Sequence, residues 1–133
     1  MPYLADLWTE SRARRLVEPF CGGLAVALSL RPRRALLNDK NIHAVHVYSW
    51  LKRGLKVNES LEFANRETLY YEHRQRFNQL ISQGEATSAE AAALFYYLNR
   101  TCYYGLCRFN SSGLFNVPFG RYMRIKLCAR FQP

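Results

Sequence analysis

A glycine-containing turn between two short apolar segments constrains the fold of this chain more than any other feature. Leu16-Val17 has the composition of a short strand and leads into the turn at residues 18–23. An apolar stretch over residues 24–30 follows, and Arg31-Pro32 ends it, because the residue before a proline disfavours helical backbone. Residues 35–38 then predict a second strand. Two strands joined by a helix within about 25 residues form a βαβ unit, so the sequence predicts an α/β fold with parallel strands.

The rest of the chain predicts helices followed by a hairpin. Apolar spacing and terminal residues indicate three helices, at residues 41–53, 66–81 and 89–101. Residues 105–119 alternate in polarity around the turn residues 111–113, which predicts a β-hairpin with a three-residue loop. We therefore divide the chain into an α/β part, a helical part and, within the latter, a basic hairpin, over residues 1–41, 42–133 and about 103–122.

The charge distribution points to an anionic partner. The formal net charge is +9, and no acidic residue follows Glu90. Nucleic acid is the commonest partner of so basic a chain. A solvated basic face without a ligand remains the alternative reading of the charge alone.

Several other classes of protein are disfavoured. About half of the 133 residues are apolar, enough for a compact core and unlike a disordered chain. No apolar run approaches the roughly 20 residues of a membrane span, and the acids near the N-terminus are unlike a signal peptide. The four cysteines show no C-x-x-C spacing, which favours free thiols in the cytoplasm and no metal site.

The turn has the chemistry of a nucleotide-type binding loop. Gly22-Gly23 would let a ligand approach the backbone at the start of a helix. Asp39, which follows the second strand 16 to 17 residues later, could accept hydrogen bonds from both hydroxyls of a ribose. The alternatives are a simple turn and an N-cap role for Asp39.

The turn also resembles a family motif. Residues 18–24 read E-P-F-C-G-G-L, and Asp39-Lys40-Asn41 ends the second strand. Dam-type DNA adenine methyltransferases carry E-P-F-x-G-x-G followed by D-x-N. The resemblance implies a partial Rossmann-like core that binds S-adenosyl-L-methionine. Phe20 would pack beside the cofactor, Gly22 would line its methionine end and Asp39 would hold its ribose, within a set that comprises Glu18, Pro19, Phe20, Gly22, Gly23 and Asp39. Leu24 stands where the motif has its second glycine.

The hairpin has a composition suited to DNA. Arg108 could present its planar fork to guanine, and Tyr103 and Tyr104 could stack on bases beside an apolar Leu106. Phosphates would be bound by the basic side chains that follow, which are Arg121, Arg124 and Lys126. The alternative is that the apolar side chains belong to a core and the arginines face water.

The hairpin is also similar to the DNA-recognition hairpin of the same methyltransferases, L-N-R-x-G-Y-N-G-L-C-R-Y/F-N-x-x-G-x-F-N-V-P-F-G-x-Y. Residues 98–122 match this string nearly throughout, except that Cys102 and Tyr104 replace a glycine and an asparagine. The resemblance implies that Tyr103 intercalates beside a flipped adenine and that Arg108 recognises guanine. The other residues it assigns to double-stranded DNA are Leu106, Asn110 and Pro118.

The family's D-P-P-Y catalytic motif is absent from the 133 residues, so no catalytic residue is assigned. We expect a site-specific adenine methyltransferase of the restriction–modification type by descent, inactive as this chain alone. A C-terminal catalytic segment is a possible partner. A catalytically inactive DNA-binding module and a fragment without activity are the alternatives.

Overall fold

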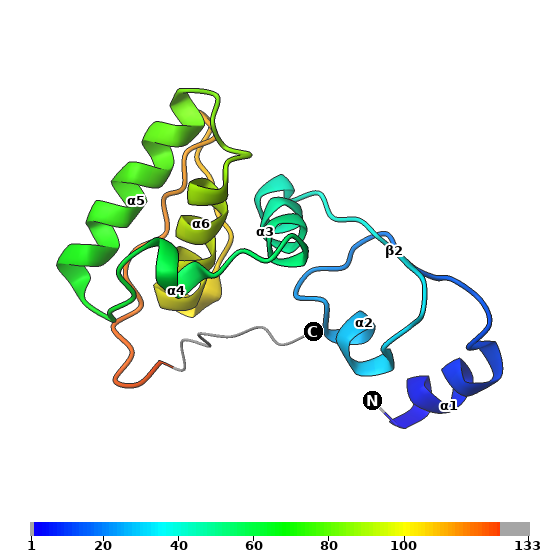
Figure 1. Ribbon diagram of the computed structural model, residues 1–133. Coiled ribbons are helices and arrows are strands. Elements are labelled where there is room, and N and C mark those ends of the chain that lie inside the picture. Colours follow the sequence, from blue (N-terminus) through cyan, green and yellow to red (C-terminus); the bar gives the residue numbers. More distant parts are fainter. Residues whose placement is uncertain (1, 126–133) are drawn as a thin grey trace. The chain divides into compact units, whose positions relative to one another are not determined.

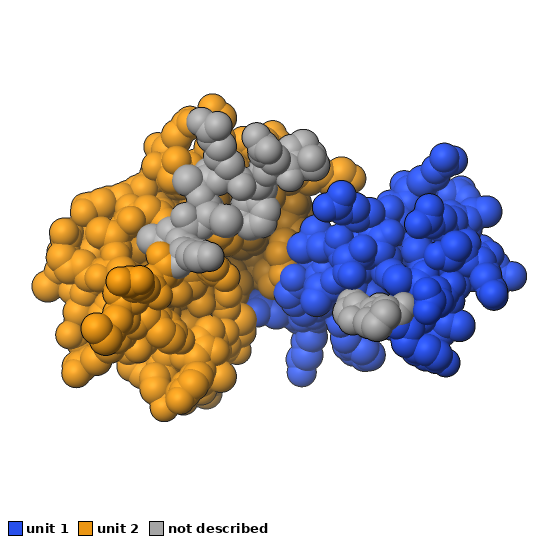
Figure 2. Space-filling view, turned by 90° about the horizontal axis from the view of Figure 1, so that it is seen from below, with its two compact units in different colours: residues 1–42 blue, residues 43–133 orange. Residues whose placement is uncertain are grey.

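The computed structural model describes residues 2–125, and the chain divides into two compact units, residues 1–42 and 43–133 (Figures 1 and 2). Each unit is described by itself. Unit 1 holds a mixed helix and strand arrangement, and unit 2 is helical with an irregular loop along its helices.

Unit 1 contains two strands and two helices, α1 (Pro2–Ser11), β1 (Leu16–Glu18), α2 (Ala25–Leu30) and β2 (Ala35–Leu37). The strands pair in parallel, with Leu16 opposite Ala35 and Glu18 opposite Leu37. The predicted parallel strands joined by a helix are therefore confirmed. Helix α1 was not predicted from the sequence, and its apolar side chains Tyr3, Leu4 and Leu7 are exposed.

Unit 2 contains α3 (Ile42–Lys52, whose first residue belongs to unit 1), α4 (Val57–Ser60), α5 (Glu67–Ser82), α6 (Ala89–Thr101) and a 3₁₀ turn η1 (Tyr103–Gly105). Figure 1 shows α5 and α6 side by side, and they pack directly against each other. Helix α6 is buried on nearly every side, from Ala91 to Phe95 and again at Tyr97, Leu98 and Thr101. A helix that is apolar all round must lie inside, so α6 is the centre of the unit.

The start of α6 follows directly from the sequence. The Ser88 hydroxyl accepts a hydrogen bond from the Ala91 N–H at 3.1 Å, as an N-cap residue does. On α5, Tyr70 and Phe77 lie two turns apart and are both fully buried. Phe115 and Val117, from the loop after α6, complete the same core.

The predicted β-hairpin is not confirmed as a pair of regular strands. Two isolated antiparallel bridges join its arms, Cys102 to Phe119 and Phe109 to Phe115. The arms also share the hydrogen bonds Asn110 N–H to the Leu114 carbonyl at 2.9 Å and Asn116 N–H to the Arg108 carbonyl at 3.3 Å. Backbone groups of Phe115 and Val117 are bonded by side chains of α5 instead. The segment is called the recognition loop below, and it comprises residues 102–122.

Candidate functional site

The first candidate site lies where β1 and β2 end in unit 1. Because the strands are parallel, their carboxyl ends meet at one edge of the sheet. The Gly22 N–H donates to Asp39 Oδ2 at 2.8 Å, and the Cys21 N–H donates to the Asn38 carbonyl at 2.8 Å. The Asn38 side-chain amide in turn donates to the Pro19 carbonyl at 3.0 Å. These bonds hold the turn after β1 and the residues after β2 together as one framework.

The Asp39 carboxylate links the two segments through hydrogen bonds to both of its oxygens. Its second oxygen, Oδ1, accepts a hydrogen bond from the Asn41 N–H at 2.9 Å. The backbone hydrogen bonds from Asn41 and Gly22 lower the pKa of Asp39, so the side chain is anionic at neutral pH. A carboxylate has about four acceptor positions, and the two backbone bonds leave capacity for hydroxyl donors of a ligand.

The turn requires left-handed backbone at two positions. Gly22 has φ +48° and Leu24 has φ +60°. Glycine adopts this region without strain, whereas a leucine there costs about 1 kcal/mol or more. A Cβ added at Gly23 would meet no atom within 4 Å, so the face above it is open. The chain thus retains an exposed backbone surface, at the cost of a strained Leu24.

Two side chains of the turn could contact a ligand: one has an exposed ring and the other has an oxygen atom without a hydrogen-bond partner in the described part of the chain. The Phe20 ring is 86% exposed. Glu18 Oε2 is buried but has no hydrogen-bond partner within residues 2–125. Pro19, between them, is exposed, and Cys21, after Phe20, is buried, so that burial raises the pKa of the Cys21 thiol. The edge therefore offers an aromatic face, an unsatisfied acceptor and a charged acceptor.

The second candidate site is the recognition loop of unit 2, which α5 holds by its backbone. The Val117 carbonyl accepts hydrogen bonds from the Tyr70 hydroxyl at 2.7 Å and from Arg74 Nη1 at 3.1 Å. Asn78 pairs with Phe115 twice, its Nδ2 donating to the carbonyl at 3.0 Å and its Oδ1 accepting from the N–H at 2.8 Å. Tyr70, Arg74 and Asn78 lie on one face of α5, and they bond the backbone of the loop at Phe115 and at Val117.

On the second arm of the loop, residues 115–118, successive residues point alternately inward and outward. Phe115 and Val117 are buried, whereas Asn116 and Pro118 are exposed. On the first arm Leu106 and Arg108 are exposed and Phe109 is half-buried, its ring stacked on His43 with centroids 4.8 Å apart. The predicted DNA-contacting residues Leu106, Arg108 and Pro118 thus share the outward positions.

At the start of the loop Tyr103 and Tyr104 form an exposed aromatic pair. Their ring centroids lie 4.4 Å apart in an edge-to-face arrangement, and Tyr104 is 75% exposed. Tyr104 has φ +51°, in the left-handed region that asparagine tolerates better than tyrosine. Cys102, just before them, is fully buried and bridges Phe119.

Asn116 orients Arg108 across the loop. Arg108 Nε donates to Asn116 Oδ1 at 2.9 Å, and Arg108 Nη2 donates to the Asn116 carbonyl at 3.2 Å. One edge of the guanidinium is therefore held by the protein, and other N–H groups stay available for a ligand. Asn116 was not singled out from the sequence, although its place opposite Arg108 in an antiparallel pattern was a usable signal.

The comparisons with known proteins bear on both sites. The model of the D12 class N6 adenine-specific DNA methyltransferases matches residues 1–128. The chain belongs to this family. Curated relatives of this D12-class chain include the Retron Ec67 DNA adenine methylase of Escherichia coli, which is 41% identical over 113 residues. The DNA adenine methylase of Salmonella typhi is 38% identical over 117 residues, and the Type II methyltransferase M.MjaIII of Methanocaldococcus jannaschii is 32% identical over 133.

The D12-class chain corresponds to only part of each of these proteins. The three alignments cover 81%, 82% and 89% of this chain but 39%, 40% and 45% of the relatives. The chain therefore spans less than half the length of the relatives it matches.

The remaining predicted site residues of the D12-class chain differ in how they are held. Asn110 Oδ1 accepts hydrogen bonds from the N–H groups of Ser112 and Leu114, so this oxygen shapes the loop tip. Arg121 forms an ion pair with Glu67 at 3.2 Å, and Arg124 is exposed. Lys126 lies outside the described residues.

Within residues 2–125, no group of three or more histidine, cysteine, aspartate or glutamate side chains could hold a metal ion. None of the described helices is both long and apolar enough to cross a membrane.

Proposed function

We propose that this chain contributes to methyl transfer from S-adenosyl-L-methionine to the N6 atom of adenine in double-stranded DNA. In this proposal unit 1 supplies part of the cofactor site and unit 2 supplies a site-specific DNA-recognition surface. The observation that carries it is the framework of Gly22 and Asp39 at the carboxyl edge of the parallel strands. Ligands of open parallel α/β sheets bind at this edge.

The residues at the edge fit the cofactor chemically. Asp39 is anionic and can accept from two ribose hydroxyls, and the exposed Phe20 ring can cover the adenine. The buried Glu18 Oε2 lacks a partner and can accept from an ammonium or hydroxyl donor. The open backbone at Gly23 and the exposed Pro19 complete the proposed site. The cofactor, when bound, supplies an electrophilic methyl group.

Calorimetry with S-adenosyl-L-methionine tests this half of the proposal. Asp39→Ala removes two charge-assisted hydrogen bonds to the ligand, each worth about 1.5–3 kcal/mol, so the affinity should fall at least tenfold. Asp6→Ala is the matched control, because Asp6 is an exposed acid elsewhere in unit 1. Equal affinity in wild type and Asp39→Ala would refute the assignment.

The recognition loop supports the DNA half of the proposal. Arg108 projects from an outward position with one edge fixed by Asn116, so its remaining donors suit guanine O6 and N7. The exposed Tyr103 and Tyr104 rings suit stacking on bases beside a flipped adenine, since base chemistry requires extrusion from the duplex. The further proposed DNA contacts are Leu106, Asn110, Pro118, Arg121, Arg124 and Lys126.

Competition binding across single-base variants of a GATC duplex tests this half. Arg108→Ala should relax discrimination at one guanine, by about 1–3 kcal/mol, and leave the salt dependence almost unchanged. Arg124→Ala, the control for a phosphate contact, should weaken all duplexes alike and reduce the salt slope by about one unit. If Arg108→Ala weakens every duplex equally, Arg108 is a phosphate anchor.

A DNA-binding module without catalysis is the second candidate function. Its support is that unit 2 builds the recognition loop from its own helix α5. No D-P-P-Y string occurs in the 133 residues, so we expect no methyl transfer by this chain alone, because nothing positions the adenine amino group. Radiolabelled methyl in DNA treated with the purified chain would contradict that expectation.

A further inference from the structure

Arginines gather at the edge of the unit 1 sheet opposite to Asp39. Both strands are preceded by an arginine-rich segment. Because β1 and β2 are parallel, the residues before them meet at one edge, and the Leu16 N–H indeed donates to the Arg34 carbonyl at 3.0 Å. Arg34 Nη2 also donates to the Ala13 carbonyl at 3.3 Å. The six arginines concerned are Arg12, Arg14, Arg15, Arg31, Arg33 and Arg34.

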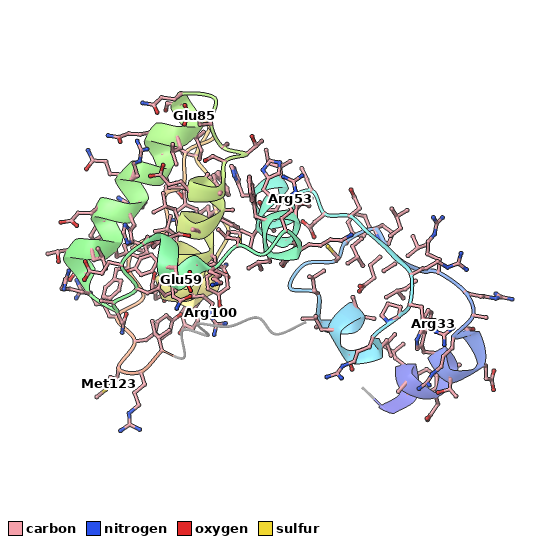
Figure 3. All side chains as sticks on the ribbon, viewed as in Figure 1. Arg33, Arg53, Glu59, Glu85, Arg100 and Met123 are labelled. Atoms are coloured by element: carbon pink, nitrogen blue, oxygen red, sulfur yellow. The ribbon has the colours of Figure 1, made fainter. Side chains whose placement is uncertain are left out.

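Part of this edge is hollowed and lined by hydrogen-bond donors. The hollow is lined by side chains of α1, the end of α2 and the segments before both strands: Trp8, Arg12, Ser29, Arg31 and Arg33, with Ala13, Leu30 and Pro32. Figure 3 shows Arg33 beside α1. Its lining residues include three arginines, a tryptophan and a serine, whose side chains are hydrogen-bond donors, and no aspartate or glutamate. Such a lining suits an anion with several acceptor oxygens.

The three arginines of the hollow have no acidic partner in the described part of the chain. Neither they nor the two acids of α1, Asp6 and Glu10, take part in an ion pair within residues 2–125. Elsewhere Arg66, Arg76 and Arg121 each pair with a glutamate. Unpaired like charges in one hollow repel each other, and an anion relieves that repulsion.

The backbone at Arg31 adds an independent observation. Arg31 is the C-cap of α2 and has φ +47°, while its N–H donates to the Ala27 carbonyl at 2.9 Å. Glycine or asparagine is the usual residue at a left-handed helix end, because a longer side chain is strained there. Arg31 therefore has a strained backbone at a position where glycine or asparagine would end the helix with less strain.

We propose that this hollow is a second nucleic-acid site, which binds phosphates of a DNA backbone without regard to sequence. The arginines and Ser29 would contact adjacent phosphates, and Trp8 would lie against the sugar or an end base. The site is distinct from the recognition loop of unit 2, and from the Asp39 edge by its place at the opposite ends of the strands. It does not rest on the proposed transfer reaction, since it needs neither cofactor nor a target adenine.

A membrane surface fits the same edge less well. Helices that lie on membranes carry lysine or arginine along their polar face. The apolar side chains of α1, which include Tyr3 and Leu7, are accompanied on that helix by Asp6 and Glu10 and by no basic residue. The basic residues lie in the segments before the strands instead.

Fluorescence of the full 133-residue chain can report on the hollow directly, because the only tryptophans are Trp8 and Trp50. A short duplex without GATC should quench part of the emission at low salt. Trp8→Phe should abolish that quenching, because Trp50 lies in unit 2 with its indole N–H bonded to the Thr87 carbonyl. The DNA concentration at half-quenching gives the affinity.

A charge-removal variant measures the phosphate contacts. The triple variant Arg12→Ala, Arg31→Ala and Arg33→Ala should reduce the slope of log affinity against log salt by about three units for duplexes with and without GATC alike. The matched control is Lys52→Ala, Lys56→Ala and Arg66→Ala, which removes three exposed charges from unit 2 and should change the slope by less than one unit. The triple Arg→Lys variant should keep most of the slope.

Three results would overturn the proposal. An unchanged slope in the triple alanine variant, with unchanged Trp8 quenching, means that the edge is merely solvated. Quenching by inorganic phosphate or a mononucleotide but not by the duplex means a small-anion site. Quenching by phosphatidylserine vesicles but not by the duplex means a lipid surface. Circular dichroism of every variant establishes that unit 1 retains its helices.

Discussion

Asn78 gives the sharpest test of how the recognition loop is held. Its amide pairs with both backbone groups of Phe115, at 3.0 and 2.8 Å, as a neighbouring strand would. Phe115 is 1% exposed, so Asn78→Ala leaves a carbonyl and an N–H beside the core without their partner. An unsatisfied buried group costs about 1–3 kcal/mol. Asn78 is itself only half-buried and water can reach part of the gap, so we expect a loss of roughly 2–4 kcal/mol in the free energy of unfolding.

Urea unfolding of unit 2 measures this loss. In a Trp8→Phe background Trp50 is the only tryptophan and reports on unit 2 alone. Gln79→Ala is the matched control, because Gln79 is the exposed neighbour of Asn78 on α5. Asn78→Asp keeps the acceptor for the Phe115 N–H but loses the donor, so it should also destabilise. If Asn78→Ala costs no more than the control, the side-chain bonds do not hold the loop.

Four further outcomes are expected for the loop. Tyr104→Asn should raise the stability of unit 2 by about 0.5–1 kcal/mol in the same urea assay, because asparagine tolerates the φ of +51° better than tyrosine does. A loss of stability would show that the contacts of the tyrosine ring outweigh the backbone strain. Iodoacetamide with mass spectrometry should modify the exposed Cys107 well before Cys102, whose burial raises its pKa to about 11, and equal rates would contradict that burial. The folded-state pKa of Cys102 lies above the ordinary value of 9.0, so the buried thiol contributes stability that is fully present below about pH 9. That stability should be lost as the pH rises toward 11, and the loss should be larger in wild type than in Cys102→Ala. Gly120→Ala should destabilise the loop, measured by thermal unfolding, since a Cβ there would come within 2.7 Å of the Cys102 carbonyl oxygen.

Elements with local signals could be predicted from the sequence. The strands around the turn, the helix between them and α6 were predicted within a residue or two, because their start and stop residues lie inside or beside them. The DNA methyltransferase family could be predicted because its two motifs are unusual strings, and the family match confirms it.

Features that depend on distant residues could not be predicted. Regular hairpin strands were expected from alternation, but the arms are joined by two isolated bridges. The backbone of Phe115 and Val117 is bonded by Tyr70, Arg74 and Asn78, which lie 37 to 47 residues earlier. Alternation is the same whether a strand or a helix supplies the partners, so the pattern could not distinguish them. The pairing of Asn116 with Arg108 was missed as well, although the antiparallel pattern places the two residues opposite each other. The roles of the site residues toward cofactor and DNA stay predictions.

The alternation of the recognition loop has a consequence for how this family can diversify. Phe115 and Val117 point inward and are held by α5, whereas Arg108, Asn116 and Pro118 point outward and carry little of the core. Substitutions at surface positions away from core contacts usually change stability by less than about 0.5 kcal/mol. Mutation at the outward positions can therefore change the side chains that the loop presents while the inward positions keep it folded. Under the proposed function, evolution and laboratory selection can explore new DNA targets on this scaffold without first losing it.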